Sequence, residues 1–263
     1  MTIRVGVFGA GGRMGSEVCR TVEADPDLEL VAAIDPYHAG LDVRDVAGVE
    51  QAQFPVSGDA QALVDGGAEV VVDFTHIDAA RQNLEFVAAN GIHAVVGTSG
   101  FIEAEHAAIT ASFTDSHCII APNFAIGAVL MIRFAETAAP YFDTAEVIEL
   151  HHDGKADAPS GTAIGTAERM ARASSDWEPD PTETETIANA RGAVGPGGIR
   201  VHSVRMRGMT AHQEVILGTA GQTLSLRHDS FDRSSFMPGV VLAVKGIADL
   251  PGLTIGLDGL LGL

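Results

Sequence analysis

The chain is poor in lysine and in cysteine. Its 263 residues include 16 lysines and arginines together, of which only Lys155 and Lys245 are lysine. The two cysteines, Cys19 and Cys118, are too few for a disulfide framework, so we expect a protein of the reducing cytoplasm. No apolar run reaches the ~18 residues that a membrane span needs. The start, MTIRVGVFGAGG, enters a strand directly and has no apolar signal segment.

Positive charge is also scarce: the 16 lysines and arginines are outnumbered by 35 acidic residues, so the formal net charge is −19 at pH 7. Such a chain is not expected to bind nucleic acid or an anionic membrane surface. An anionic ligand would need a local cluster of positive side chains. The candidates for that cluster are His151, His152, Lys155, Arg205, Arg207 and Arg227. With 46% hydrophobic residues, the chain is long enough for one large domain or two modest ones.

The first 35 residues predict a dinucleotide-binding βα unit. An apolar strand at residues 3–8 runs into GAGGRMG, with glycines at 9, 12 and 15, and then into a helical pattern. A second strand, residues 28–34, ends at Asp35, which can accept hydrogen bonds from an adenosine ribose. Glycine permits the tight turn and the close approach of a pyrophosphate, whereas the alternative interpretation is an ordinary tight turn.

The strand and helix rhythm continues to about residue 138. Near-continuous apolar runs predict strands at residues 70–72, 94–96 and 118–120, and a helix follows each. Such runs are typical of a parallel sheet covered on both faces. Small and polar residues follow the last two strands, at the sheet edge where these folds bind ligands. The candidates for a cofactor wall are Gly97, Thr98, Ser99, Ala121, Pro122, Asn123 and Phe124, with ordinary turns as the alternative.

After residue 140 the pattern changes. It predicts a strand at 147–150, a helix at 161–173, loops at 174–186 and 192–198, three strands at 199–205, 214–217 and 223–227, and a helix at 237–247. We predict an α/β protein with an N-terminal Rossmann-type parallel sheet and a second α+β domain on an open mixed sheet. The expected domains are 1–125, completed by 235–263, and 126–234. The second would bind substrate and mediate oligomerisation, and hinge closure at the two connections would bring them together.

The segment ELHHDGKADAPSGTA, residues 149–163, gathers groups that can donate protons. His151 and His152 follow the apolar strand, and Lys155 lies three residues beyond them. Ser160 can cap a helix start, where free N–H groups favour an anion. We therefore predict a site that protonates an anionic substrate, with ordinary surface or core histidines as the alternative. No metal is expected, because adjacent strand residues face opposite ways and no Cys or His partners lie at ligand spacing.

These motifs together resemble one family over essentially the whole chain, the bacterial dihydrodipicolinate reductases (4-hydroxy-tetrahydrodipicolinate reductases) of lysine and diaminopimelate biosynthesis. The most specific match is E-L-H-H-x-x-K-x-D-A-P-S-G-T at residues 149–162. GAGGRMG at 9–15, Asp-Phe-Thr at 73–75, Gly-Thr-Ser-Gly at 97–100 and APNFAIG at 121–127 support it. AHQEV at 211–215 and RHDS at 227–230 look like the actinobacterial branch. Ser99 departs from the threonine common in the family but keeps the hydroxyl.

The resemblance implies the reduction of 4-hydroxy-tetrahydrodipicolinate, a small dicarboxylate, to tetrahydrodipicolinate with loss of water. It implies that His151 is the proton donor and acceptor and that Lys155 is a proton donor. The residues implied to bind substrate are His152, Ser160, Gly161 and Thr162. Those implied to bind NADH or NADPH are Gly9, Ala10, Gly11, Gly12, Arg13, Met14, Gly15, Asp35 and the cofactor-wall candidates above. The family also implies a homotetramer with contacts through the second domain's sheet.

Two rival interpretations remain at this point. One is a related enzyme such as an aspartate-semialdehyde-type dehydrogenase, which would need a nucleophilic cysteine, but Cys118 lies within a predicted strand. The other is a non-catalytic NAD-binding sensor, against which His151 and Lys155 argue. On the cofactor, Asp35 favours the free 2′-hydroxyl of NADH and repels a 2′-phosphate. Arg13 can offset that repulsion, so we expect NADH to serve at least as well as NADPH.

Overall fold

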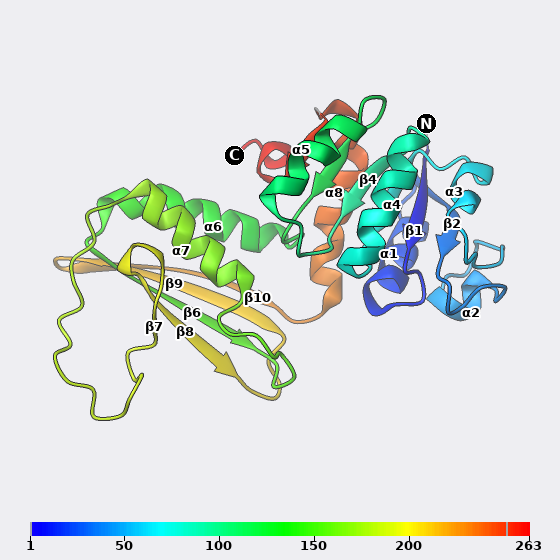
Figure 1. Ribbon diagram of the computed structural model, residues 1–263. Helices are drawn as coiled ribbons and strands as arrows, with labels where there is room; N and C mark the ends of the chain where they lie inside the picture. The colour runs from blue at the N-terminus through cyan, green and yellow to red at the C-terminus, as the bar shows by residue number, and fades with distance from the viewer. Residues whose placement is uncertain (1, 251) are drawn as a thin grey trace. The chain divides into compact units, whose positions relative to one another are not determined.

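The computed structural model describes residues 2–250 and 252–263, and it divides into two compact units (Figure 1). Unit 1 contains the chain up to Phe124 and again from Phe236 onward. Unit 2 contains Ala125–Ser235. The chain therefore leaves the first unit once and returns to it after the second is complete.

Unit 1 is built on a parallel sheet of six strands in the order β11-β5-β4-β3-β1-β2. Both neighbours of β1 come later in the chain, so the strand order reverses there, and such a reversal is where ligands bind in open α/β sheets. The predicted parallel sheet is confirmed, whereas the sixth strand, β11, was not predicted. The strands are β1 (Ile3–Phe8), β2 (Leu28–Ile34), β3 (Val70–Asp73), β4 (His93–Val96), β5 (Cys118–Ile120) and β11 (Leu253–Ile255).

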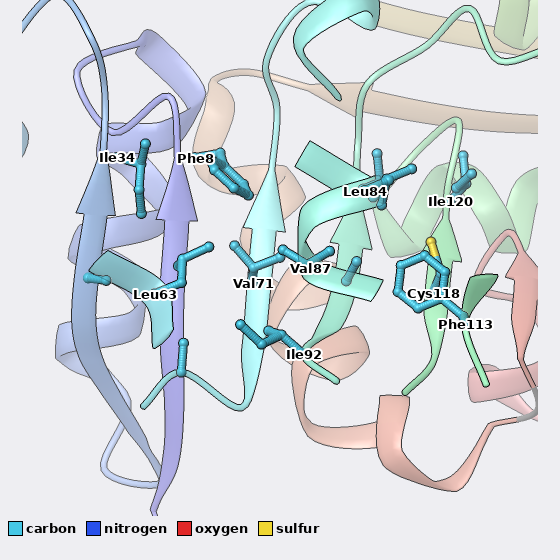
Figure 2. Packing of buried hydrophobic residues seen from close by; sticks show 14 residues of the cluster. Phe8, Ile34, Leu63, Val71, Leu84, Val87, Ile92, Phe113, Cys118 and Ile120 are labelled. Atoms are coloured by element: carbon cyan, nitrogen blue, oxygen red, sulfur yellow. The ribbon is translucent and has the colours of Figure 1, made fainter. Parts of the chain in front are cut away.

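Helices cover both faces of this sheet. One face carries the apolar cluster of Figure 2, in which Leu63 of α3, Leu84 and Val87 of α4 pack with Phe8, Val71 and other strand residues. On the opposite side, α1 and α8 pack against each other and against the sheet. The helices are α1 (Arg13–Ala24), α2 (Val43–Ala47), α3 (Gln61–Asp65), α4 (Ile77–Ala89), α5 (Glu103–Ser112) and α8 (Met237–Gly246), with 3-10 turns at Ile247–Asp249 and Asp258–Leu261.

The C-terminal helix is held to unit 1 by close packing and by charge. A Cβ at Gly239 of α8 would lie 2.0 Å from the carbonyl oxygen of Phe124, so only glycine allows this approach. At the other end of α8, the Lys245 ammonium lies 2.8 Å from Asp25 and 2.7 Å from Asp27. These contacts join the C-terminal segment to unit 1.

Unit 2 is an open mixed sheet in the order β10-β9-β6-β8-β7. The pair β6 and β8 is parallel and the other pairs are antiparallel, so the predicted mixed sheet is confirmed. Helices α6 and α7 lie on one face of it (Figure 1), where Val147, Val215 and Leu217 pack against Ala167 and Met170. The elements are α6 (Ile126–Ala138), β6 (Thr144–His151), α7 (Gly161–Ala173), β7 (Ala193–Val194), β8 (Arg200–Arg205), β9 (Ala211–Thr219) and β10 (Gln222–Ser230), with 3-10 turns at Ala139–Tyr141, Pro196–Gly198 and Arg233–Phe236.

Three strands of unit 2 are longer than predicted. Strand β6 begins at Thr144 and ends at His151, and β9 and β10 also extend beyond their apolar centres. Polar residues at the ends of these strands interrupt the apolar pattern, so hydrophobicity predicts only the centres of the strands. The expected loop at 192–198 contains the short edge strand β7 and a 3-10 turn. No helix within the described ranges is long and apolar enough to cross a membrane.

The packing of Gly239 gives a test of the fold. We expect Gly239→Ala to lower the free energy of unfolding by about 1–3 kcal/mol, because the added methyl group must displace helix α8 from Phe124. Thermal unfolding followed by circular dichroism measures this change. The control is Gly259→Ala, where a Cβ meets nothing within 4 Å. Equal melting temperatures for the two variants would contradict the close contact.

Candidate active site

The glycine-rich turn of unit 1 is closed by contacts that exclude larger residues. Gly9 adopts a φ of +68°, and its carbonyl oxygen accepts a hydrogen bond of 2.9 Å from the Gly12 N–H. A Cβ at Gly15 would lie 2.0 Å from that same oxygen. Helix α1 then begins at Arg13 without a side-chain cap, and the first N–H groups of a helix have no acceptor within it. Such groups can bind an anion.

A cavity of about 610 Å³ lies beside this turn, lined by Gly9, Gly12, Asp35 and residues that follow β3. The Asp35 carboxylate is buried at the end of β2 and accepts hydrogen bonds from the N–H groups of Gly11 (2.9 Å) and Tyr37 (3.0 Å). It is therefore fixed at the position where this type of fold binds an adenosine ribose. The structure brings Asp35 and the glycine turn together as the sequence predicted.

The ends of β3, β4 and β5 are linked to one another. The Thr98 hydroxyl donates to the carbonyl oxygen of Thr75 (2.8 Å). A Cβ at Gly97 would lie 2.0 Å from the Phe74 ring, which in turn lies 5.5 Å from the ring of Phe124. These contacts place Gly97, Thr98 and Phe124 in one group.

The residues that line the cavity differ from those predicted to form the cofactor wall. Phe74, Thr75, His76 and Asn83 line it, whereas residues 97–99 and 121–124 are absent from its described lining. Ala121 is buried, and its N–H donates to the carbonyl oxygen of Val96 at the end of β4. Pro122 and Ser99 are exposed. Phe74 and Thr75 were noted in the sequence only as part of a motif. Their position directly after a buried strand was the signal that they face a ligand site.

In unit 2, His151 is the last residue of β6 and lies on the same side of the strand as Glu149. Its Nδ1 lies 2.5 Å from Glu149 Oε2. Arg205, at the end of the neighbouring strand β8, donates two hydrogen bonds of 2.8 Å to the same carboxylate, one to each oxygen. The Ser160 N–H donates to Oε1 at 3.2 Å. Sequence reasoning gave Glu149 no role, although a carboxylate inside an apolar strand, two residues from His151, was the available signal.

Burial and hydrogen bonding act in opposite directions on the two titratable groups. Burial disfavours the ionised form of Glu149, but hydrogen bonds from Arg205, Ser203 and His151 outweigh it and lower the pKa of this carboxyl. For His151, burial is the larger effect, so its pKa is lowered although Glu149 favours the protonated ring. Both shifts favour a carboxylate beside a neutral imidazole.

The remaining predicted residues follow β6 in one loop. The Lys155 ammonium is 2.8 Å from both carboxylate oxygens of Asp157, and only 22% of its side chain is exposed. His152 is exposed. Of the arginines considered for a positive cluster, Arg205 joins the site, whereas Arg207 pairs with Asp153, and Arg227 pairs with Glu214 and Asp229.

Helix α7 begins where the loop ends. Ser160 is its N-cap, and its hydroxyl oxygen accepts a hydrogen bond of 3.2 Å from the Ala163 N–H. A Cβ at Gly161 would meet no atom within 4 Å, so the space in front of this helix start is open. The N–H groups of Gly161 and Thr162 cannot find acceptors inside the helix. Free N–H groups at a helix start are suited to a carboxylate.

The two cysteines lie in α1 and β5, apart from these residues of unit 2. Both cysteines are buried, and burial raises the pKa of the Cys19 thiol to about 12 and that of Cys118 further still. Neither is an activated nucleophile. Within the described ranges, no three His, Cys, Asp or Glu side chains are grouped so that they could hold a metal ion.

A parallel sheet with a glycine turn for a nucleotide, joined in one chain to a unit carrying an imidazole and an ammonium, defines a nucleotide-dependent oxidoreductase. Two family models match almost the whole chain. One, described as dihydrodipicolinate reductase, N-terminus, matches residues 3–124, and the other, dihydrodipicolinate reductase, C-terminus, matches residues 127–261. The chain therefore belongs to the dihydrodipicolinate reductase family, an enzyme family that uses a pyridine nucleotide, and the predicted family is confirmed.

Curated relatives and a solved structure agree with this assignment. A 4-hydroxy-tetrahydrodipicolinate reductase of Nocardia farcinica is 52% identical over 271 positions, covering 100% of both chains. One of Corynebacterium urealyticum is 49% identical, covering 99% of both. The structure of a dihydrodipicolinate reductase from Paenisporosarcina sp. TG-14, with dipicolinate bound, has a TM-score of 0.86 and 39% identity, covering 98% of this chain and 99% of that one.

Proposed function

We propose that this protein reduces 4-hydroxy-tetrahydrodipicolinate to tetrahydrodipicolinate with loss of water, in lysine and diaminopimelate biosynthesis. The observation that carries the proposal is the position of His151, whose Nδ1 is held by Glu149 within the segment most specific to the family. The relatives at 52% and 49% identity are named for the same reaction. The net change consumes one hydride and one proton and releases one water.

The chain's own residues supply the proton transfers. Loss of water from the substrate requires a base to take a proton from carbon, and hydride addition to the resulting ring requires an acid to return one. His151, a neutral imidazole beside a carboxylate, can take the proton and then give it back. Lys155 donates a proton from its ammonium group to the departing hydroxyl group, which leaves as water, once substrate replaces Asp157 as its neighbour. Positioned groups of this kind contribute about 10²–10⁴-fold each.

The substrate is a dicarboxylate, and we assign its binding to His152, Ser160, Gly161 and Thr162. Support comes from the open space in front of Gly161 and from the N–H groups at the start of α7. A carboxylate there is favoured by the positive end of the helix dipole as well as by hydrogen bonds.

We assign the nucleotide to unit 1. The turn of Gly9, Ala10, Gly11, Gly12, Arg13, Met14 and Gly15 would hold the pyrophosphate, and Asp35 the ribose. Residues 97–99 and 121–124 would border the nicotinamide. When bound, the nicotinamide supplies the hydride. Support comes from the tight turn, whose Gly15 admits no side chain, and from the cavity beside it. We also propose a homotetramer, for which the support is the second face of the unit 2 sheet, where Ile148, Leu150 and Ile216 are partly exposed.

The catalytic assignment is tested by His151→Ala and Lys155→Ala. We expect each to lower kcat by about 10²–10⁴-fold, with little effect on nucleotide affinity, because neither belongs to unit 1. Turnover is followed by oxidation of NADH with freshly generated substrate, and nucleotide binding by calorimetry. Near wild-type turnover in both variants would show that the assignment is wrong.

The role of the helix start is tested by Gly161→Ala. Its methyl group would meet no protein atom but would occupy the space assigned to a substrate carboxylate. We expect KM and the Kd of pyridine-2,6-dicarboxylate to rise by at least tenfold, about 1.4 kcal/mol. The matched control is Gly165→Ala, one turn further along α7 and equally free of contacts. If both variants bound the dicarboxylate like the wild type, the carboxylate would lie elsewhere.

Cofactor preference follows from Asp35. Its buried carboxylate would accept hydrogen bonds from a ribose hydroxyl and repel a 2′-phosphate, whereas Arg13, exposed at the start of α1, offsets the repulsion. We expect kcat/KM with NADH to be at least equal to that with NADPH in parallel assays. A hundredfold preference for NADPH would contradict this expectation.

A further inference from the structure

Glu149 is a carboxylate in a place where the surrounding chain is apolar. It interrupts the run from Val147 to Leu150, and its side chain is 0% exposed beneath α7. Burying an ion without partners costs several kcal/mol, so a charge at this position needs compensation from its neighbours.

The neighbours of this carboxylate are hydrogen-bond donors, among them the hydroxyl group of Ser203. Oε2 faces His151 Nδ1 and one terminal nitrogen of Arg205, at 2.5 and 2.8 Å. Oε1 faces the other terminal nitrogen of Arg205 and the Ser160 N–H, at 2.8 and 3.2 Å. Because an ionised carboxylate can only accept hydrogen bonds, the proton of a neutral His151 ring must be on Nδ1. Its Nε2 is then left with a free electron pair.

We propose that Glu149 is a positioning residue for the reaction, which fixes His151 as the Nδ1–H tautomer so that Nε2 begins the cycle as a proton acceptor. This inference rests on the proposed function, and it assigns both proton transfers to one atom of the His151 ring. His151 first takes a proton from substrate carbon at Nε2 and later returns that proton from Nε2. Nδ1 keeps its own proton throughout, because its partner carboxylate is shared with Arg205.

The geometry explains why an uncharged residue of the same shape cannot replace Glu149. A glutamine has one acceptor and one donor at the end of its side chain. Arg205 offers a donor to each oxygen position, so in either orientation the amide nitrogen would face an Arg205 nitrogen. The Ser203 hydroxyl can also accept a hydrogen bond, but among the nitrogen donors only His151 can adapt to this change, by moving its proton from Nδ1 to Nε2. That tautomer would present a donor to the substrate in place of an acceptor.

The charges around His151 predict the direction of a change in its titration. Glu149 on the same strand raises the pKa of His151, whereas burial, Lys155 of the following loop and Arg205 of β8 lower it. Replacement of Glu149 by an uncharged residue removes the raising effect and leaves the others. The pKa of His151 should then fall, and the acid limb of the activity profile, below which Nε2 is protonated, should move to lower pH.

The first experiment examines the wild-type protein and does not depend on activity. Solid-state ¹⁵N spectra of protein labelled on histidine, recorded above the histidine pKa range, distinguish a protonated from an unprotonated Nε2. The signals of His151 are assigned from their loss in His151→Gln. We expect His151 to be the Nδ1–H tautomer. A protonated Nε2 would overturn the inference even if the enzyme is fully active as proposed.

The second experiment compares Glu149→Gln with Glu146→Gln. Glu146 lies on the same strand and also pairs with a histidine and an arginine, His202 (2.5 Å) and Arg191 (2.6 Å), although its side chain is 30% exposed. For Glu149→Gln we expect kcat to fall by about 10²-fold, with a smaller change in KM, and the acid limb to move to lower pH. Glu146→Gln should keep the wild-type kcat and acid limb.

The outcomes separate positioning from a purely structural role. A Glu149→Gln enzyme that melts at a lower temperature but keeps the wild-type kcat and acid limb would show that Glu149 only neutralises Arg205. If that variant does not fold, the tautomer of the wild-type His151 still decides the matter. If His151→Ala itself remains active, the proposed function fails separately from the tautomer measurement.

Discussion

A carboxylate without access to water must find all its hydrogen-bond donors inside the protein, and this requirement organises the candidate active site. The donors to Glu149 come from the end of β6, the end of β8 and the start of α7. These segments are separated by up to 56 residues in the sequence. One buried charge therefore sets the position of the imidazole, the arginine and the helix start together, and each depends on the others.

The nucleotide side of the molecule relies on a different constraint, the absence of side chains. At Gly15 and Gly97 an added Cβ would lie 2.0 Å from another atom, a backbone oxygen in one case and the Phe74 ring in the other. Asp35 is held there by backbone N–H groups, and the buried Asp73 at the end of β3 accepts hydrogen bonds from Thr75 and Asn83. Sterics thus shape the surface assigned to the cofactor, whereas hydrogen-bonded charge shapes the surface assigned to the substrate.

Much of the secondary structure could be predicted from the sequence, wherever the local pattern of apolar residues decides it. Strand β2 was predicted with its observed bounds, and α7 was predicted close to them, because apolar runs and helix starts mark these elements clearly. The three-residue strand β11 was missed, since it has too little periodicity and gains its stability by pairing with β5. The partnership of Glu149 with Arg205 was also missed. It depends on the parallel register of β6 and β8, which residue types alone do not reveal.

The division of unit 1 between the two ends of the chain has a consequence for synthesis on the ribosome. Strand β11 and helix α8, which complete the six-stranded sheet and cover one of its faces, are translated after all of unit 2. Until then the edge of β5 and the apolar surface beneath α8 have no native partner. Unit 1 thus stays incomplete while more than a hundred residues of unit 2 are translated. During this time its exposed apolar surface is a binding site for chaperones.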